Sequence, residues 1–235
     1  QATLIGISLA TKHGKAGYVP LRHNPSHQSS LLADGTSAIK QIPFDEAIAL
    51  LKPMLEDPSI LKIGHNIKYD ALVVQQTKNG SIRIKSVDDT MCLSYVLEGG
   101  LHGHGLDELS ELHFDHTNIK YKDICGSGKS QISFAEVDVE KALDYAAEDA
   151  DMTFRLHKKL KGMLARNKMT TVYETLERPL IPILTQMENN GIKVDPLILK
   201  KMSEDFSKRL ENQAEEIYST SGSEFNIGSP KQLGE

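Results

Sequence analysis

Several features that mark whole classes of protein are scarce in this sequence. Its apolar runs are much shorter than the roughly 20 residues needed to cross a bilayer, so no membrane partner is expected. It has only two cysteines, Cys92 and Cys125, and no CxxC or His/Cys cluster, which argues against a zinc site or a disulfide framework. A reducing, cytoplasmic setting is therefore expected.

The sequence also lacks an excess of positive charge. Its 235 residues carry 27 Lys and Arg against 32 Asp and Glu, a net charge of −5. A broad electrostatic clamp on nucleic acid needs a basic face, so that class of protein is excluded. An enzyme that holds a nucleic-acid end through metal ions stays open, because the ions then face the phosphates.

Strand-like and helix-like patterns alternate in the first part of the chain. Alternating β-branched residues predict a hairpin of strands at 2–10 and 16–22, and Pro20 indicates that the second strand lies at a sheet edge. The polar stretch 24–40 predicts a long loop. Further segments are expected as strands at 60–65 and 82–87, and as helices at 44–56, from 66 onward, at 90–98 with Asp89 as cap, at 106–114 and at 134–164.

Beyond about residue 170 the strand patterns stop. Helix-breaking and helix-starting residues divide this part: prolines at 179 and 182, Gly191, Asp195-Pro196 and Ser229-Pro230. The prolines predict a kink within 171–189, and Asp195-Pro196 opens a helix to about Tyr218. We therefore divide the chain into an α/β domain at 1–170 and the opening of a larger helical domain at 171–235.

Two helices each carry a carboxylate with a polar residue four positions earlier. Asn66 precedes Asp70 where a strand runs into a helix, and Tyr145 precedes Asp149 in the long helix. Residues four apart lie one above the other on the same side of a helix, so each pair can point into one cavity. Strand-to-helix junctions are also where α/β proteins usually build their sites.

The alternative for the long helix is purely structural. Asp144, Glu148 and Asp151 would then form a solvated acidic face, and Tyr145 would be a half-buried aromatic residue. Acidic helix faces are common, so this stretch taken alone favours that alternative. The matching carboxylate upstream, Asp70, favours a site instead.

Carboxylate oxygens are the protein ligands that Mg²⁺ prefers. Two divalent ions about 3.5–4 Å apart can generate an attacking hydroxide and stabilise the leaving oxygen of a phosphoryl displacement. Asp70 and Asp149 are candidate ligands for such ions, and the Tyr145 phenol could orient a water. Two carboxylates alone are few for a two-metal site, and no other α/β stretch supplies more.

Two segments resemble motifs of the DEDD group of 3′–5′ exonucleases. Residues 64–70 (GHNIKYD) are similar to the second motif, and residues 145–153 (YAAEDADMT) to the third, in the subgroup marked by a tyrosine. The version that they match is the exonuclease domain of bacterial, family A DNA polymerase I. Residues 89–91 (DTM) and 105–109 (GLDEL) also fit that domain.

Three later segments resemble the start of the family A polymerase domain, where its thumb helices begin. They are residues 177–180 (ERPL), 187–195 (MENNGIKVD) and 225–233 (FNIGSPKQL). The resemblance therefore covers essentially the whole chain. The later segments are the more specific ones, because stand-alone ribonucleases of the group would not carry them.

The resemblance implies an α/β, ribonuclease H-like 3′–5′ exonuclease fold, a mixed sheet flanked by helices, followed by an all-helical segment. It implies two divalent ions, Mg²⁺ or Mn²⁺, with Asp70 and Asp149 as ligands. By the same resemblance, Tyr145 would orient the attacking water, Asn66 would support the second motif, and Tyr121 would pack near the terminal base. The implied activity is proofreading removal of nucleotides from the single-stranded 3′ end of DNA. The parent would be a monomeric, cytoplasmic, nucleoid-associated polymerase of replication and repair.

The first motif of the family, Asp-x-Glu on the opening strand, is expected just before residues 2–10, and the sequence begins at Gln1. We therefore expect a piece of a longer protein that binds ions weakly and has at most traces of activity by itself. Two other readings stay open: a catalytically inactive scaffold or DNA-end-binding module of the same polymerase, and a stand-alone ribonuclease. Retention of both Asp70 and Asp149 argues against the scaffold, and the motifs after residue 174 argue against the ribonuclease.

Overall fold

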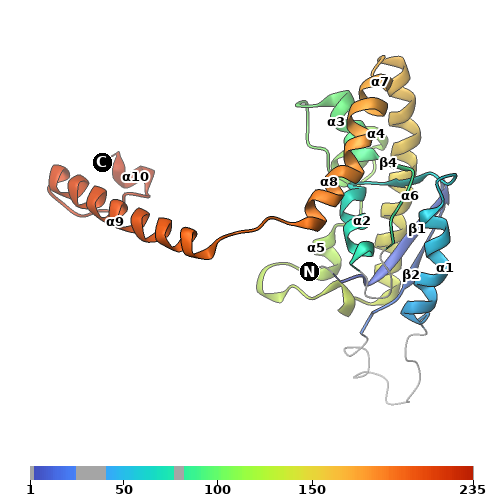
Figure 1. Cartoon of the computed structure of the whole chain (residues 1–235), viewed down its shortest axis with the longest axis horizontal. Helices are drawn as coiled ribbons and strands as arrows, with labels where there is room; N and C mark the ends of the chain where they lie inside the picture. Colours follow the sequence, from blue (N-terminus) through green and yellow to red (C-terminus); the bar gives the residue numbers. More distant parts are fainter. Residues whose placement is uncertain (1–2, 25–40, 77–81, 235) are drawn as a thin grey trace. The chain divides into compact units, whose positions relative to one another are not determined.

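The computed structural model describes residues 3–24, 41–76 and 82–234 (Figure 1). The loop predicted at 24–40 lies, apart from Asn24, outside these residues. The chain divides into two compact units, Gln1–Asn190 and Gly191–Glu235. The boundary between these units lies about 20 residues beyond the domain division predicted at 170/171, and that division stays a prediction.

The first unit contains strands and helices in alternation, as the sequence predicts. The described strands are β1 (Gly6–Lys12), β2 (Lys15–Pro20), β3 (Lys62–Gly64) and β4 (Val87–Asp89). The helices are α1 (Phe44–Glu56), α2 (Ile67–Gln75), α3 (Thr90–Glu98), α4 (Leu106–Phe114), α5 (Tyr121–Cys125), α6 (Val139–Arg166), α7 (Thr170–Val172) and α8 (Arg178–Asn190). Short turns of 3-10 helix, η1 (Gly128–Ser130) and η2 (Phe134–Glu136), precede α6, and a π-helical turn, η3 (Tyr173–Glu177), joins α7 to α8.

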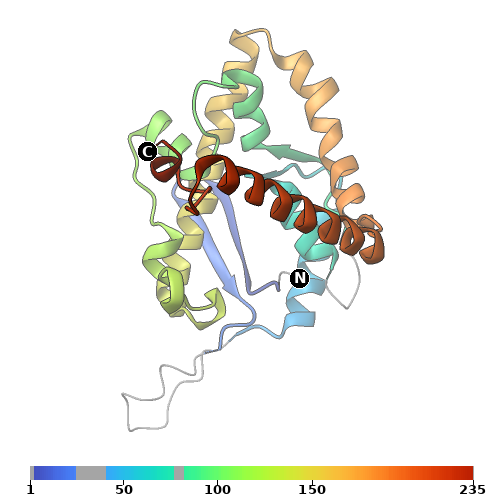
Figure 2. The same cartoon turned by 90° about the vertical axis from the view of Figure 1, so that its left-hand side faces the viewer.

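The predicted hairpin is confirmed, with β1 and β2 antiparallel and Gly6 opposite Pro20. A second pair, β3 and β4, is parallel, with Gly64 opposite Asp89. The strands form these two separate sheets rather than the single mixed sheet that was expected, because no described strand pairs between them. Helix α6 contacts β1, β2 and β3, and so links the two sheets (Figures 1 and 2).

The strand predicted at 82–87 is wrong in its bounds, since pairing begins only at Val87. The apolar residues before it pack into a core instead. Ile82 is fully buried and clusters with Ile48 of α1 and Val74 of α2. Their apolar pattern therefore reflects packing against two helices and not strand pairing.

The long helix begins later than predicted. Residues 134–136 form a separate turn that is closed by reciprocal bonds between Ser133 and Glu136. Helix α6 starts after Asp138, whose side chain accepts a hydrogen bond from the Glu140 amide at 2.9 Å. A capping residue of this kind satisfies an amide that has no partner within the helix.

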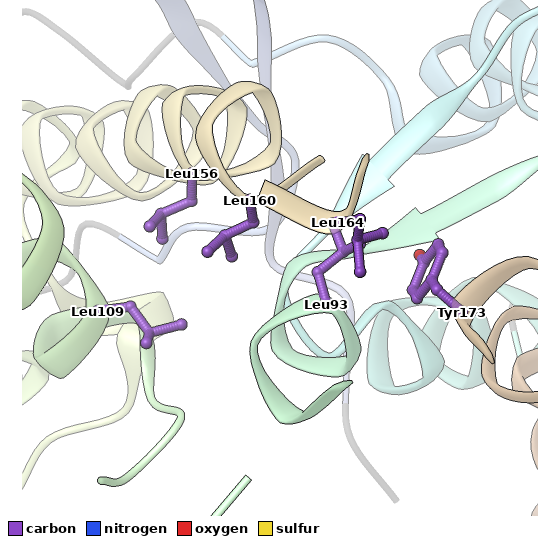
Figure 3. Packing of buried hydrophobic residues seen from close by; sticks show 6 residues of the cluster. All are labelled: Leu93, Leu109, Leu156, Leu160, Leu164 and Tyr173. Carbon is purple, nitrogen blue, oxygen red and sulfur yellow. The ribbon is translucent and has the colours of Figure 1, made fainter. Parts of the chain in front are cut away.

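The second half of α6 lies on the main hydrophobic core. Leu156, Leu160 and Leu164 project from one side of the helix, where they are one turn apart (Figure 3). They pack with three other buried side chains, Leu93 of α3, Leu109 of α4 and Tyr173 of η3. Full burial of one leucine stabilises a fold by about 1.5–3 kcal/mol, so this cluster fixes α6 against the neighbouring helices.

A π-helical turn lies just ahead of α8, close to Pro179, while Pro182 lies inside α8, and the predicted kink itself stays a prediction. Proline cannot donate the amide bond that an α-helix needs, and a wider turn relieves that mismatch. Gly191 follows α8 with a positive φ of 72°, as its predicted position after a helix requires.

The second unit is helical. Helix α9 (Pro196–Ser221) begins as predicted, with the Asp195 side chain accepting from the Leu197 amide at 2.9 Å. It ends slightly beyond the predicted Tyr218, at a left-handed Gly222. Ser229 caps the short α10 (Pro230–Leu233) in the same way. In the part of the chain that the structure describes, no helix combines the length and the apolar character that a membrane crossing requires.

Candidate active site

Asn66 and Asp70 lie where β3 passes into α2, as the sequence predicts. Asn66 has a left-handed conformation (φ 59°, ψ 46°), and α2 begins at the next residue, with Asp70 one turn further on. A side chain at Gly64 would place its Cβ 2.7 Å from Ile67, so only glycine allows this tight junction. The local sequence therefore determines where α2 starts and where Asp70 lies on it.

The surroundings of Asp70 disfavour its charged form. Removal of water by the surrounding protein raises the pKa of its carboxyl to about 6, and the nearby Asp89 carboxylate contributes in the same direction. Asp70 nevertheless keeps an exposed surface. A cation from solvent can therefore reach the Asp70 carboxylate, and its charge would stabilise the ionised form that the protein surroundings disfavour.

Tyr145 and Asp149 share one side of α6, and both are part-buried. Burial raises the pKa of Asp149 to about 7, and the charges of Asp107 and Glu148 add to the shift, although the Tyr145 hydroxyl opposes it. The pKa of the Tyr145 phenol is also raised, first by burial and then by the charge of Asp149 and its hydrogen bond to that carboxylate. The phenol is thus a neutral donor at neutral pH.

Tyr121 comes from α5 and lies beside this pair. Its ring is edge-on to the Tyr145 ring, with 6.3 Å between centroids, and it stacks on Phe134 at 6.3 Å. Tyr121 is 43% exposed and contacts Tyr145, which shares one side of α6 with Asp149. The structure therefore brings Tyr121, Tyr145 and Asp149 together.

Two polar residues join this group that sequence reasoning did not assign to it. Asp107, near the start of α4, acts electrostatically on both Asp149 and Tyr145. Asn118 is 4% exposed, and neither atom of its amide has a hydrogen-bond partner of normal geometry in the described chain. Its amide still lies close enough to Asp149 to lower the pKa of that carboxyl. The matched segment 105–109 pointed to Asp107, whereas no sequence signal pointed to Asn118.

The solvated acidic face proposed as an alternative is wrong for two of its three members. Glu148 accepts a hydrogen bond from the Ile119 amide at 2.7 Å and contacts His116 at 2.8 Å, which ties the preceding loop to α6. Asp151 accepts from the amide of Gly14 in the hairpin turn at 2.6 Å. These two carboxylates are structural, while Asp149, between them, is not used in this way.

The candidate metal ligands lie on different elements and interact with different carboxylates. Asp70 is influenced by Asp89, and Asp149 by Asp107 and Glu148. Oxygen donors with raised pKa values fit a hard divalent cation, because a cation would stabilise their charged forms. Within the described ranges, however, no group of three His, Cys, Asp or Glu side chains gathers to hold an ion.

Comparison with known proteins identifies the family to which the chain belongs. Residues 2–165 match the family model described as 3′-5′ exonuclease of DNA polymerase A, and the chain belongs to that family. Among its relatives, it is 47% identical over its whole length to DNA polymerase I of Rhizobium leguminosarum and 38% identical to that of Pseudomonas aeruginosa. The chain thus carries the 3′–5′ exonuclease domain found in DNA polymerase I, and it spans about a quarter of these relatives, 24% and 25% of their lengths.

Solved structures share the fold. The polymerase domain of Pol1 from M. smegmatis, in complex with a DNA primer-template and dNTP, aligns with 93% of this chain and 33% of its own, with a TM-score of 0.62 and 24% identity. Brucella melitensis NrnC with bound Mg²⁺ aligns with 82% of this chain and 80% of its own, with a TM-score of 0.55 and 22% identity. The expected exonuclease-type α/β fold is thereby confirmed.

Proposed function

We propose that this chain is the proofreading exonuclease region of a family A DNA polymerase, which hydrolyses the terminal nucleotide from a single-stranded 3′ end with two divalent ions. One observation carries the proposal. Asp149 is part-buried next to the Tyr145 phenol, and no ion pair with a cationic side chain of the described chain compensates its charge. A buried carboxylate of this kind is characteristic of functional sites.

Asp70 and Asp149 would hold the ions, here Mg²⁺ or Mn²⁺. When bound, such ions would activate a water for attack and stabilise the leaving 3′ oxygen. The Tyr145 hydroxyl remains protonated because its pKa is raised, so it can donate a hydrogen bond that orients the water. Asn66 forms the left-handed turn at which α2 begins, and this starting point determines where Asp70 lies along the helix.

Tyr121 supports DNA as the partner. Its exposed ring, stacked on Phe134, is a surface on which a terminal base can stack, and stacking of this kind is tolerant of sequence. The relatives that span the whole chain are DNA polymerases I, and one fold neighbour is in complex with a DNA primer-template. A monomeric, cytoplasmic parent active in replication and repair completes the proposal.

The first experiment measures excision from a 3′-labelled DNA single strand by the full-length protein, with Mg²⁺, with Mn²⁺ and with chelator. Asp149→Ala should reduce metal-dependent excision by about 1,000-fold or more, since changes behind a metal ligand already cost about 10–100-fold. Tyr145→Phe is the matched variant, because it keeps the ring packing and removes only the hydroxyl. It should lower the turnover rate while DNA binding is unchanged.

The second candidate is a catalytically inactive scaffold or DNA-end-binding module of the same polymerase. The observation in its favour is that the described residues supply no group of three metal ligands. Wild-type protein that binds the DNA end but excises no faster than its Asp149→Ala form would support this candidate. The 235-residue chain alone is expected to excise at trace rates at most, and robust excision by it would contradict that expectation.

A further inference from the structure

A single carboxylate joins the starts of two helices next to the candidate site. Asp89, the last residue of β4, is 2% exposed. Its Oδ1 accepts hydrogen bonds from the amides of Met91 at 2.8 Å and Cys92 at 3.2 Å, which is the predicted cap of α3. The same side chain also accepts from Asn66 at 3.2 Å and, through Oδ2, from Ile67 at 2.7 Å, at the start of α2.

Helix α2 depends on this contact because its own first residue does not cap it. Asn66 occupies the capping position in a left-handed conformation, and its side chain makes no capping hydrogen bond. The first amides of a helix have no partner within the helix, so an external acceptor decides how they are held. For α2 that acceptor is Asp89, which lies 22 residues from Ile67 in the sequence.

Asp89 is itself held in place from two sides. Parallel pairing sets it opposite Gly64, the end of β3. Its amide donates to the Tyr173 hydroxyl at 3.0 Å, and that hydroxyl is 3.3 Å from Oδ1 of Asp88. Asp88 is in turn bound by His157 at 2.7 Å. The strand residue that caps α2 is therefore held by its pairing with β3 and, through its own backbone amide, by Tyr173.

We propose that Asp89 is a positioning residue for the exonuclease site, which sets the orientation of Asp70 by capping the N-terminus of α2. Asp70 is one turn into that helix, so a rotation or fraying of its first turn displaces the carboxylate directly. Residues behind a metal ligand commonly control its geometry in this way. The inference rests on the proposed function, since it assigns Asp89 a role through a ligand of that site.

The test compares two neighbouring buried aspartates in the full-length protein. Asp89→Ser keeps a side chain that can cap α3, but serine is too short to reach the α2 amides as well. Asp88→Asn is the matched control, because Asp88 is equally buried, at 1%, lies in the same strand and has its hydrogen-bond and ion-pair partners in Tyr173, His157, Lys161 and Arg178 rather than in α2. Asparagine keeps an oxygen that can accept from the Tyr173 hydroxyl, so the residue that holds the Asp89 amide keeps its partner. Amide hydrogen exchange at Asn66 and Ile67 reports the capping contact without reference to activity.

Mn²⁺ binding is measured by calorimetry without DNA, and subtraction of the Asp70→Ala titration isolates the ions of this site. Asp89→Ser should accelerate exchange at Asn66 and Ile67 and weaken Mn²⁺ binding roughly 10-fold, with a matching rise in the Mn²⁺ concentration for half-maximal excision. Asp88→Asn should lower the melting temperature but leave both the exchange at these amides and the Mn²⁺ affinity unchanged.

Faster exchange at Asn66 and Ile67 with unchanged Mn²⁺ affinity in Asp89→Ser would overturn the inference. An equal loss of Mn²⁺ affinity in Asp88→Asn would also overturn it, because the effect would then follow general destabilisation. If the wild type and Asp70→Ala bind Mn²⁺ alike, the proposed function fails instead. If Asp89→Ser does not fold, Asp89→Asn, which keeps the shape and one acceptor oxygen, is compared in its place.

Discussion

Asp88 and Asp149 are both shielded from water beside α6, yet the pKa values of their carboxyl groups are shifted in opposite directions. Burial raises the pKa of each carboxyl. For Asp88, hydrogen bonds from His157 and Lys161 and the charges of Lys161 and Arg178 outweigh burial, and its pKa falls to about 2. For Asp149 nothing outweighs burial, and its pKa rises to about 7.

The difference distinguishes a carboxylate that is paired within the protein from the one proposed as a metal ligand. Asp88 is bound by Lys161 at 3.0 Å and by Arg178 at 3.1 Å, and Glu174 links these two cations at 2.6 and 2.7 Å. Such a network is complete within the chain and holds η3 and α8 against β4. Among the residues that the structure describes, no cationic side chain pairs with Asp149, so a cation bound from solvent would stabilise its charged form.

Breaking the complete network should have the largest effect on stability. Asp88→Asn should lower the free energy of unfolding by about 3 kcal/mol, at the lower end for a broken buried pair. The lower end applies because Lys161 and Arg178 are 32% and 31% exposed, so water can partly solvate them. Urea unfolding at pH 7 measures the loss, and a change below about 1 kcal/mol would contradict the network's importance.

Removing the charge of Asp149, which has no cationic partner among the described residues, should instead raise the free energy of unfolding. With divalent ions removed by chelator, Asp149→Asn should stabilise the protein by about 2 kcal/mol at pH 8, a figure reduced for partial exposure. Between the ordinary pKa of 3.8 and about 7, the folded state holds a proton that the unfolded state has lost. The cost of folding therefore grows with pH over this window, and the gain from Asp149→Asn should vanish near pH 4. Equal gains at pH 4 and pH 8 would refute this account.

Protonation of Asp88 at low pH should remove the contribution of its ion-pair network to the stability of the fold. Because the pKa of Asp88 is lower in the folded state (about 2) than its ordinary value of 3.8, its contribution is present above pH 4. It should be lost as the pH falls through this window towards 2, at a cost of about 1–2 kcal/mol. Asp88→Asn should remove this part of the acid dependence, and an unaltered acid profile in that variant would exclude Asp88 as its source.

The smallest change in stability is expected for Asp151, a neighbour of Asp149 whose carboxylate binds the hairpin turn. Asp151→Asn weakens one hydrogen bond, to the Gly14 amide of the hairpin turn, and should cost about 0.5–1 kcal/mol. Excision by the full-length protein should not change, since Asp151 has no part in the proposed site. Loss of activity in Asp151→Asn comparable to that of Asp149→Ala would mean that the acidic side of α6 acts as a whole.

Local patterns in the sequence determined much of this protein. Capping residues and helical periodicity located α1, α3 and α4 at their observed bounds, and spacing of four residues placed Tyr145 with Asp149 on one side of α6. These features depend on neighbours within a turn, so the sequence contains them directly. The strand predicted at 82–87 shows the limit, since its apolar pattern served packing with α1 and α2.

Only the tertiary structure decided which of many similar carboxylates have partners. Asp88, Asp89 and Asp149 look alike in sequence, yet they differ in the structure. Asp88 is paired with cations, Asp89 caps two helices, and Asp149 is compensated by no cation of the described residues. The contacts that distinguish them join residues far apart in the chain, such as Asp88 with His157 and Asp89 with Ile67. The sequence by itself specified the groups and their local spacing, whereas their charge states follow from burial and from distant partners that only folding brings together.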